Sequence, residues 1–302
     1  MLVSVCICTY RRETLVETLR SIQAQVLPTG VDIEIVVVDN DAEGSARVLV
    51  DTIAKELVYS VRYFREPARG LSLVRNRALK MARGDWLALI DDDEVADRMW
   101  LSALLSTAKK FSADAVIGEV KPIFETPPPP WILSNKVFDL WIPKTGNKLG
   151  MGEAKTGNAL INASFLKTKK IFFDPSYNTT GGEDSDFFRK ALDRGALIVS
   201  SREAIVRELI PKERMTPGFL VRRSLRVGET YAKLTHRHGG MAAVATCIPR
   251  SAVNVVAAAA LTVVCLPLGR STYYRFYLLF VRNLGKFRYF LQLPSIELYG
   301  KS

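Results

Sequence analysis

The sequence predicts an α/β protein, with a mostly parallel sheet flanked by helices and a helical C-terminal region. Two observations support this fold class. Short apolar segments alternate with segments of helical periodicity through the first 120 residues, as in parallel βαβ units whose sheet is covered on both faces. The net charge of +11 is confined to the other end of the chain, because residues 201–302 hold 16 of the 42 basic residues but only 5 of the 31 acidic ones.

The first 120 residues supply the repeating units. The expected strands are short and rich in apolar and β-branched residues, and the expected helices repeat apolar residues every three or four positions. The strands are Val3–Cys8, Ile33–Val38, Val61–Phe64, Trp86–Ile90 and Ala115–Val120. The helices are Thr14–Val26, Ala46–Leu57, Leu71–Ala82 and Leu101–Phe111.

The alternation stops at a proline-rich segment. Thr126–Trp131 contains four consecutive prolines and is predicted to be neither helix nor central strand. A second loop is expected at 146–157, where glycines are frequent. A short strand, Ala159–Asn162, and a helix, Asp184–Leu192, follow. The domain boundary is expected at residue 210, so that 1–210 form one domain and 211–302 a basic C-terminal region.

The C-terminal region has a membrane-like composition. Ala252–Leu268 is the most apolar segment of the chain, and Arg250 and Arg270 flank it. Its 17 residues reach about 25 Å as a helix, the lower limit for a membrane span. Residues 273–291 mix aromatic and basic side chains, as at an interface with anionic lipid. We expect contact with an anionic membrane surface, whereas the alternative is a buried helical hairpin.

Few residues suit redox or histidine chemistry. The four cysteines, Cys6, Cys8, Cys247 and Cys265, lie in apolar segments without metal-binding spacing, which favours a reducing compartment. His236 and His238 are the only histidines, which argues against a histidine-based triad or zinc site. The chain starts directly with a strand-like segment, and we expect no secretory signal.

Polar clusters follow three of the expected strands. They are Thr9–Arg12, Asp39–Asp41 and Asp91–Glu94. Ligands of α/β proteins bind beyond the carboxyl ends of parallel strands. A single aspartate at such a position is often a helix cap. Three clusters at strand ends of one sheet favour a binding site.

The run Asp91-Asp92-Asp93 predicts a cation site. Three consecutive carboxylates repel one another unless a cation neutralises them. Hard oxygen ligands select Mg²⁺ or Mn²⁺, which complete their coordination with substrate phosphates. The alternative is a solvated acidic turn.

These motifs together resemble the family 2 inverting glycosyltransferases of GT-A fold. The resemblance covers about residues 1–210 and is closest to bacterial exopolysaccharide members, particularly the succinoglycan-type glucosyltransferases. It implies a nucleotide-sugar-binding half, 1–120, and an acceptor half, 121–210. The segments that carry it are Val3–Arg12, Ile35–Asn40, Gly70–Asn76 and Gly84–Asp93.

The resemblance also implies roles for individual residues. Asp39 would bind uracil by accepting its imide N–H, and Asp93 would bind Mn²⁺ or Mg²⁺. Asp91 would lie near the ribose and donor sugar. The side chains expected to bind the nucleotide sugar are Thr9, Tyr10, Arg12, Asp39, Arg75, Asn76, Asp91 and Asp92.

On the acceptor side, the segment 180–186 resembles the family's Glu-Asp motif. Asp184 would be the general base that takes the proton of the acceptor hydroxyl, with Glu183 beside it. The alternative is a helix N-terminus with favourable acidic residues. Gly157 and Asn158 resemble the wall of the acceptor site.

A basic pair and a missing motif bear on the reaction. Arg222 and Arg223 could hold the donor diphosphate or an acceptor pyrophosphate, or could form a solvated helix face. The Gln-x-x-Arg-Trp motif of processive family members is absent from the sequence. This absence favours the transfer of a single sugar.

We therefore expect transfer of one hexose, glucose, from a UDP-sugar to a lipid-linked (polyprenyl diphosphate) oligosaccharide in exopolysaccharide biosynthesis. The expected location is the cytoplasmic face of the inner membrane, as a peripheral or monotopic protein. One alternative is a sugar-phosphate nucleotidyltransferase, but the loop 9–14 lacks the glycines of such enzymes. Another is a nucleic-acid-binding protein, suggested by the basic C-terminus. The aromatic residues there adjoin an apolar segment, which favours lipid, so no nucleic acid is expected.

Overall fold

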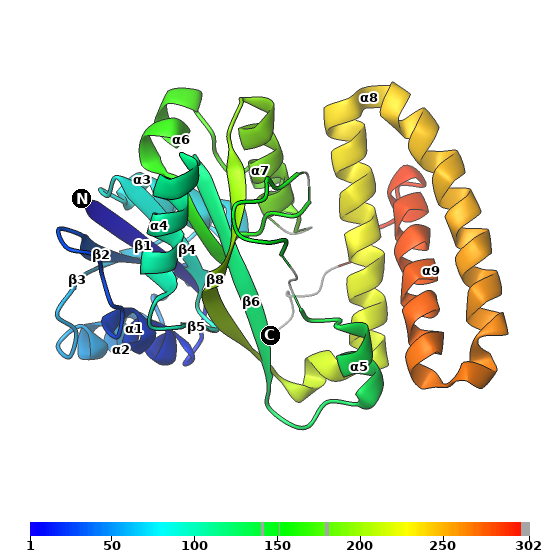
Figure 1. Cartoon of the computed structure of the whole chain (residues 1–302), viewed down its shortest axis with the longest axis horizontal. Helices are drawn as coiled ribbons and strands as arrows, with labels where there is room; N and C mark the ends of the chain where they lie inside the picture. The colour runs from blue at the N-terminus through cyan, green and yellow to red at the C-terminus, as the bar shows by residue number, and fades with distance from the viewer. Residues whose placement is uncertain (140–141, 151, 179–180, 297–302) are drawn as a thin grey trace. The chain divides into compact units, whose positions relative to one another are not determined.

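The computed structural model describes residues 1–139, 142–150, 152–178 and 181–296 (Figure 1). The described residues fall into two compact units. The N-terminal unit comprises Met1–Ile123, Asp139–Asn178 and Glu183–Leu209. The C-terminal unit comprises the described residues of Phe124–Phe138, Thr179–Gly182 and Ile210–Ser302.

An eight-stranded mixed sheet, in the order β3-β2-β1-β4-β7-β6-β8-β5, forms the centre of the N-terminal unit. Strand β1 pairs in parallel with β2 and β4, and β2 with β3. Strand β7 is antiparallel to β4 and β6. The strands are β1 Leu2–Thr9, β2 Asp32–Asp39, β3 Ser60–Arg65, β4 Trp86–Asp91, β5 Glu94–Ala96, β6 Ala115–Phe124, β7 Asn158–Asn162 and β8 Ile198–Ile210.

Helices cover both faces of this sheet. Alternate residues of β1 point to opposite sides, so Val5 packs in the core with α1, α2 and α4, whereas Cys6 packs in the core with α3, α6 and α7. This arrangement confirms the predicted α/β fold class. The helices are α1 Leu15–Gln23, α2 Arg47–Ile53, α3 Leu71–Met81, α4 Trp100–Phe111, α6 Ala163–Lys169 and α7 Glu183–Asp193, with a 3₁₀ turn, η1, at Pro175–Tyr177.

Several segments differ from the expected elements, among them β5 and α6, which were not expected. The proline-rich stretch was expected to be non-helical, but helix α5, Pro130–Asn135, begins within it and buries Trp131. Proline is compatible with the first helical turn, where its missing N–H has no intrahelical partner. Strand β8 was not expected, because its 13 residues include Arg202 and Arg207 on the less buried positions.

The C-terminal unit consists mainly of two long helices, α8 Pro217–Val264 and α9 Arg270–Phe290. Gly240 has non-helical angles (φ 59°, ψ −160°) and divides α8 into 217–239 and 241–264. Figure 1 shows the two halves of α8 running in opposite directions, with α9 between them in this view. Two 3₁₀ turns, η2 Lys212–Met215 and η3 Leu266–Leu268, lie before α8 and between the helices.

Glycines allow α8 and α9 to approach each other closely. A Cβ on Gly228 would lie 2.0 Å from the carbonyl oxygen of Arg282, and a Cβ on Gly285 would lie 2.1 Å from that of Leu225. The Glu229–Arg288 ion pair, at 2.7 Å, joins the same two helices.

One helix among the described residues, α8, is long and apolar enough to cross a membrane by length and composition. Its most apolar 18-residue window has a mean hydropathy of 1.6, and only 17% of that window is buried. An apolar segment was expected at 252–268. Helix α8 contains its residues 252–264 and continues from them toward the N-terminus, whereas Leu266–Leu268 form the 3₁₀ turn η3.

Candidate functional site

The carboxyl ends of three parallel strands bring the predicted clusters to one edge of the sheet. Thr9 is in register with Asp39 of β2, and Cys8 is in register with Asp91 of β4. Because parallel strands end at the same edge, the polar residues that follow β1 and β4 lie side by side.

The acidic turn after β4 is held by specific hydrogen bonds. The Thr9 hydroxyl donates to Asp92 over 2.7 Å, and Arg12 donates to Asp93 over 3.1 Å. The carboxylate of Glu94 accepts the backbone N–H of Asp91 over 2.9 Å. The turn is therefore fixed by the loop after β1 and by its own last residue, and it is not a freely solvated acidic segment.

The carboxylates of the turn are crowded. Partial burial raises the pKa of Asp91; Arg75 opposes this shift, and the nearby charges of Asp93 and Glu183 add to it. Burial raises the pKa of Asp92 to about 6, although the hydrogen bond from Thr9 opposes it. An additional positive charge at this turn would relieve the repulsion.

Arg75 of α3 joins the turn to helix α7. Its guanidinium forms an ion pair with Glu183 and lies 3.5 Å from Asp91. The Arg75 side chain is 12% exposed and that of Glu183 is 7% exposed, so this is a buried pair. The pKa of Arg75 is raised, because Glu183 and Asp91 outweigh the opposing effect of burial. The second carboxylate oxygen of Glu183 is buried and accepts no hydrogen bond from the described residues.

Asp184, the predicted base, begins α7 beside Glu183. One of its oxygens accepts the Ser185 N–H over 2.7 Å, and the other lies 3.6 Å from the ammonium of Lys155. Burial by itself would raise the pKa of Asp184, but Lys155 and Arg75 lower it below its ordinary value. Asp184 is therefore kept ionised, the state in which a carboxylate can accept a proton.

Glycines allow close approach at two points. A Cβ on Gly157 would lie 2.6 Å from the Glu94 carboxylate and 3.1 Å from that of Asp91, so only glycine brings the backbone against these groups. Gly181 and Gly182 precede α7 with positive φ values of 68° and 96°. Thr180, at the start of the predicted acceptor motif, lies outside the described residues.

A cavity of about 250 Å³ lies in the C-terminal unit and includes Gly181 in its lining. Its lining combines charged and hydroxyl groups with a larger apolar surface. The lining residues are Gly181, Glu229, Thr230, Lys233, Tyr289, Gln292, Leu293 and Ser295.

Asp39 has partners within its own loop. It is completely buried, and its carboxylate accepts the N–H groups of Asp41 and Ala46 and the hydroxyl of Tyr63, all within 2.9 Å. Asp39 thus caps the loop between β2 and α2, as strand-end aspartates often do. Its contact with uracil stays a prediction.

Two predicted amides are likewise used inside the fold. Asn76 exchanges two hydrogen bonds with the backbone of Phe173, at 2.8 and 2.9 Å. Asn158 is completely buried, accepts the indole N–H of Trp100 and donates to the carbonyls of Glu119 and Ala204. Asn158 is therefore held in the core, where a buried amide must satisfy its hydrogen bonds within the protein. Asn76 is only half-buried, and a ligand contact of either residue stays a prediction.

Tyr10, in the loop after β1, is half-buried and has two arginines at its ring. The guanidinium of Arg69 lies 4.4 Å from the centre of its ring, and that of Arg11 lies 5.3 Å from it. Two cations around one aromatic ring form a surface that suits a planar base or a phosphate.

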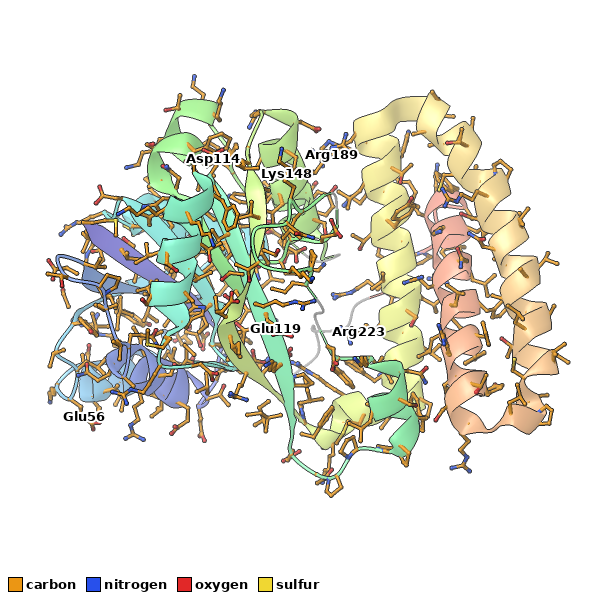
Figure 2. All side chains as sticks on the ribbon, in the orientation of Figure 1. Glu56, Asp114, Glu119, Lys148, Arg189 and Arg223 are labelled. Atoms are coloured by element: carbon orange, nitrogen blue, oxygen red, sulfur yellow. The ribbon has the colours of Figure 1, made fainter. Side chains whose placement is uncertain are left out.

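Arg222 and Arg223 belong to α8 in the C-terminal unit. Arg222 is exposed. Arg223, labelled in Figure 2, donates to the carbonyl of Val137 over 3.1 Å and lies 5.3 Å from the ring centre of Phe138. Arg223 therefore has a structural contact within its own unit, and a diphosphate contact for either arginine stays a prediction.

Sequence reasoning missed two members of the site. Lys155 was part of an expected loop and had no assigned role, although it is only two residues before Gly157. Glu94 was identified as the end of the acidic run, but the sequence does not show that Glu94 is buried, with only 3% of the residue exposed. Burial strongly raises the pKa of Glu94, with the charge of Asp91 as the second cause.

The described residues by themselves do not form a closed metal site. Among the described residues, no group of three or more His, Cys, Asp or Glu side chains has an arrangement that could hold a metal ion. Asp91 and Asp93 nevertheless offer hard carboxylate oxygens, and the Asp91 side chain is 45% exposed. A Mg²⁺ or Mn²⁺ ion bound here would need further oxygen ligands from a substrate or water.

Comparison with known sequences gives two findings. The model of "Glycosyl transferase family 2" matches residues 4–167. The chain is also 35% identical to the succinoglycan biosynthesis protein ExoM of Rhizobium meliloti, over 99% of this chain and 96% of ExoM.

Comparison with solved structures supports the fold. The mannosyltransferase PcManGT of Pyrobaculum calidifontis, solved with GDP-Man and Mn²⁺, aligns with a TM-score of 0.61 and 20% identity over 94% of this chain and 86% of PcManGT. S. aureus TarS in complex with UDP-GlcNAc aligns with a TM-score of 0.54 and 17% identity over 97% of this chain and 93% of that chain. These likenesses establish the GT-A fold of the chain.

Proposed function

Because the chain belongs to glycosyltransferase family 2, we propose that it transfers a single glucose residue from UDP-glucose to a lipid-linked oligosaccharide during exopolysaccharide biosynthesis. One observation carries the proposal: the acidic turn after β4 and the carboxylate of Asp184 lie in one unit, joined through Arg75. The similarity to a succinoglycan biosynthesis protein along nearly the whole chain supports an exopolysaccharide product. Family membership favours this reading over the nucleotidyltransferase and nucleic-acid-binding alternatives.

The donor binds at the strand-end edge of the sheet. Tyr10 and its neighbouring arginines contact the uridine side, while Asp91 and Asp92 face the ribose and the sugar. Arg12, 40% exposed and paired with Asp93, supplies a cation for the donor diphosphate. Thr9 acts indirectly, by holding Asp92 through its hydroxyl.

The acidic turn suits a divalent cation. Its ligands are hard oxygens, its carboxylates are crowded, and it lacks a full protein coordination shell, so donor phosphate oxygens can complete the site. Asp93, with Asp91 beside it, would hold Mn²⁺ or Mg²⁺. When bound, this ion would stabilise the negative charge that develops on the leaving diphosphate.

Asp184 acts as general base on the acceptor side. It takes the proton of the acceptor hydroxyl while that oxygen forms a bond to the anomeric carbon. The bond from this carbon to the diphosphate oxygen breaks in the same displacement, and UDP leaves with inversion of configuration. Gly157 lets the backbone approach the reacting groups, and Glu183 fixes Arg75 behind them.

The acceptor is proposed to be membrane-bound. A polyprenyl diphosphate carrier would keep the growing oligosaccharide at the cytoplasmic face of the inner membrane, where nucleotide sugars are available. The long apolar helix α8 and the basic C-terminal region support this location.

Calorimetry of donor binding tests the proposal. We expect UDP-glucose to bind in the presence of Mn²⁺, with binding at least tenfold weaker without the ion or in Asp93→Ala. Asp51→Ala, which removes an exposed carboxylate from α2, should bind as the native protein does.

Binding measurements with other nucleotides show which part of the proposal is wrong if UDP-glucose does not bind. Binding of UDP but not UDP-glucose would indicate another UDP-sugar, and binding of GDP-mannose alone would replace the uridine assignment. If no nucleotide sugar bound with or without Mn²⁺, the proposed donor site would be wrong.

A further inference from the structure

The second half of α8, residues 241–264, exposes an apolar face. Val253, Val256, Val263 and Val264 are each at least 65% exposed. Their spacing of three and seven residues places them on one side of the helix. The opposite side, with Val244, Cys247, Ser251 and Ala258, is buried. A surface helix of a water-soluble protein normally turns polar residues to the solvent, so this face has the composition of a face that is covered.

The apolar face is free of charge and bordered by cations. No charged residue occurs from residue 251 to residue 269, and the exposed Arg250 and Arg270 lie at the two ends of this segment. The neighbouring helix α9 adds the exposed Arg275 and Arg282 and contains no acidic residue. Apolar side chains beside exposed positive charges match the boundary between the hydrocarbon and the headgroups of an anionic membrane.

We propose that residues 241–264 lie in the plane of an anionic membrane leaflet, with the valine face inserted among the acyl chains and the arginines of α9 at the headgroups. The proposal rests on the membrane-bound acceptor proposed above and specifies how the enzyme reaches it. The occupant of the apolar face is lipid, not a second protein, because the surrounding cations are complementary to anionic headgroups.

Length alone would permit a membrane span, since 24 helical residues reach about 36 Å. The packing of α9 argues against it. Helix α9 runs antiparallel to residues 241–264 (Figure 1). A span would therefore carry Arg275 and Arg282 into the hydrocarbon with no acidic partner on their own helix, which the bilayer strongly disfavours.

Interhelical contacts keep α9 in place. Gly228 and Gly285 bring the backbones of α8 and α9 together, and the Glu229–Arg288 ion pair lies beside them. These contacts hold α9 against the first half of α8, residues 217–239, and Figure 1 shows α9 packed along residues 241–264 as well. We therefore expect α8 and α9 to meet the membrane together.

Flotation with vesicles that contain 30% phosphatidylglycerol tests the valine face, using the full chain and no sugar donor or acceptor. We expect Val253→Glu/Val256→Glu to lower the vesicle partition coefficient about a hundredfold, since each inserted valine contributes roughly a tenfold factor. Val48→Glu, at a position 77% exposed on α2, is the matched control and should bind normally. Unaltered circular dichroism and donor binding would show that the double variant is folded.

Insertion depth distinguishes the orientations. Residue 253 is at the middle of 241–264, so a span would place it at the bilayer centre and an in-plane helix near the headgroups. We expect the fluorescence of Val253→Trp, corrected for the native tryptophans, to be quenched more by lipids brominated near the headgroup than by lipids brominated near the chain end. Stronger quenching at the chain end would establish a span and overturn the proposal.

Two other results would also overturn it. Absence of vesicle binding by the native protein would exclude the membrane surface, while leaving the donor site to the calorimetric test. Unchanged binding of the double-glutamate variant, with loss of binding in Arg275→Gln/Arg282→Gln, would mean that only charge holds the protein to lipid.

Discussion

Replacing Glu183 with glutamine removes the charge from one partner of the buried Arg75–Glu183 pair. Breaking a buried ion pair by neutralising one partner typically costs about 3–5 kcal/mol, because the other charge stays buried without compensation. Arg75 retains Asp91 at 3.5 Å, but that carboxylate is 45% exposed and compensates only in part. We therefore expect Glu183→Gln to lower the free energy of unfolding by about 3 kcal/mol, the low end of this range.

The matched control is the exposed pair Arg47–Asp51 of α2. It has a short distance, 2.7 Å, but its side chains are 59% and 53% exposed. Water screens such a pair, so Asp51→Asn should cost only about 0.3–0.5 kcal/mol. Urea unfolding followed by far-UV circular dichroism and tryptophan fluorescence measures both variants under the same conditions.

A loss in Glu183→Gln no larger than that in Asp51→Asn would refute the reasoning. A double variant gives a second check. Arg75→Met/Glu183→Gln leaves no buried cation unpaired and should be less destabilised than the sum of its two single variants. Strict additivity would mean that the two side chains do not stabilise each other.

Two further predictions concern the base and the helix pair. Lys155→Met removes a charge that keeps the pKa of Asp184 low. The acidic limb of the profile of kcat/KM against pH should therefore move to higher pH. The control is Lys167→Met, which changes an exposed lysine on α6 and should leave the profile unchanged. An unchanged profile in Lys155→Met would remove Lys155 from the environment of the base. Gly285→Ala should destabilise the protein by about 1–3 kcal/mol in thermal unfolding, because the new Cβ would meet the backbone carbonyl of Leu225. The control is Gly218→Ala, where the new Cβ would enter open space, so the change should be neutral or slightly stabilising. Equal effects of the two alanines would show that α8 and α9 are not in close contact.

The donor edge of the sheet was largely predictable. Apolar runs ending in polar residues located β1, β2 and β4 within two residues of their observed bounds. Parallel topology then requires those ends to share one edge. The acidic turn at Asp91–Asp93 follows from that rule and from the sequence together.

The function of each polar residue at that edge was less predictable. Asp39 and Asp91 both close parallel strands, yet Asp39 is completely buried and caps a loop, whereas Asp91 is partly exposed. Asn158 directly follows Gly157, but it faces the core and accepts the indole N–H of Trp100. A motif gives the position of a residue along the chain, and burial determines whether its side chain faces ligand or protein.

The sequence by itself determined the alternation of strands and helices through the first 120 residues, the family, and the basic and apolar character of the C-terminal region, because periodicity and composition are local properties of the chain. Only the tertiary structure decided which charges meet. The contact of Lys155 with Asp184 joins residues 29 positions apart, and Arg75 and Glu183 are 108 positions apart. Such contacts depend on how α3, α7 and the intervening loops pack on the sheet, and no local pattern records that packing. The same holds for the valine face of α8, since the sequence shows that the helix is apolar, but only the packing of α9 shows which side remains uncovered.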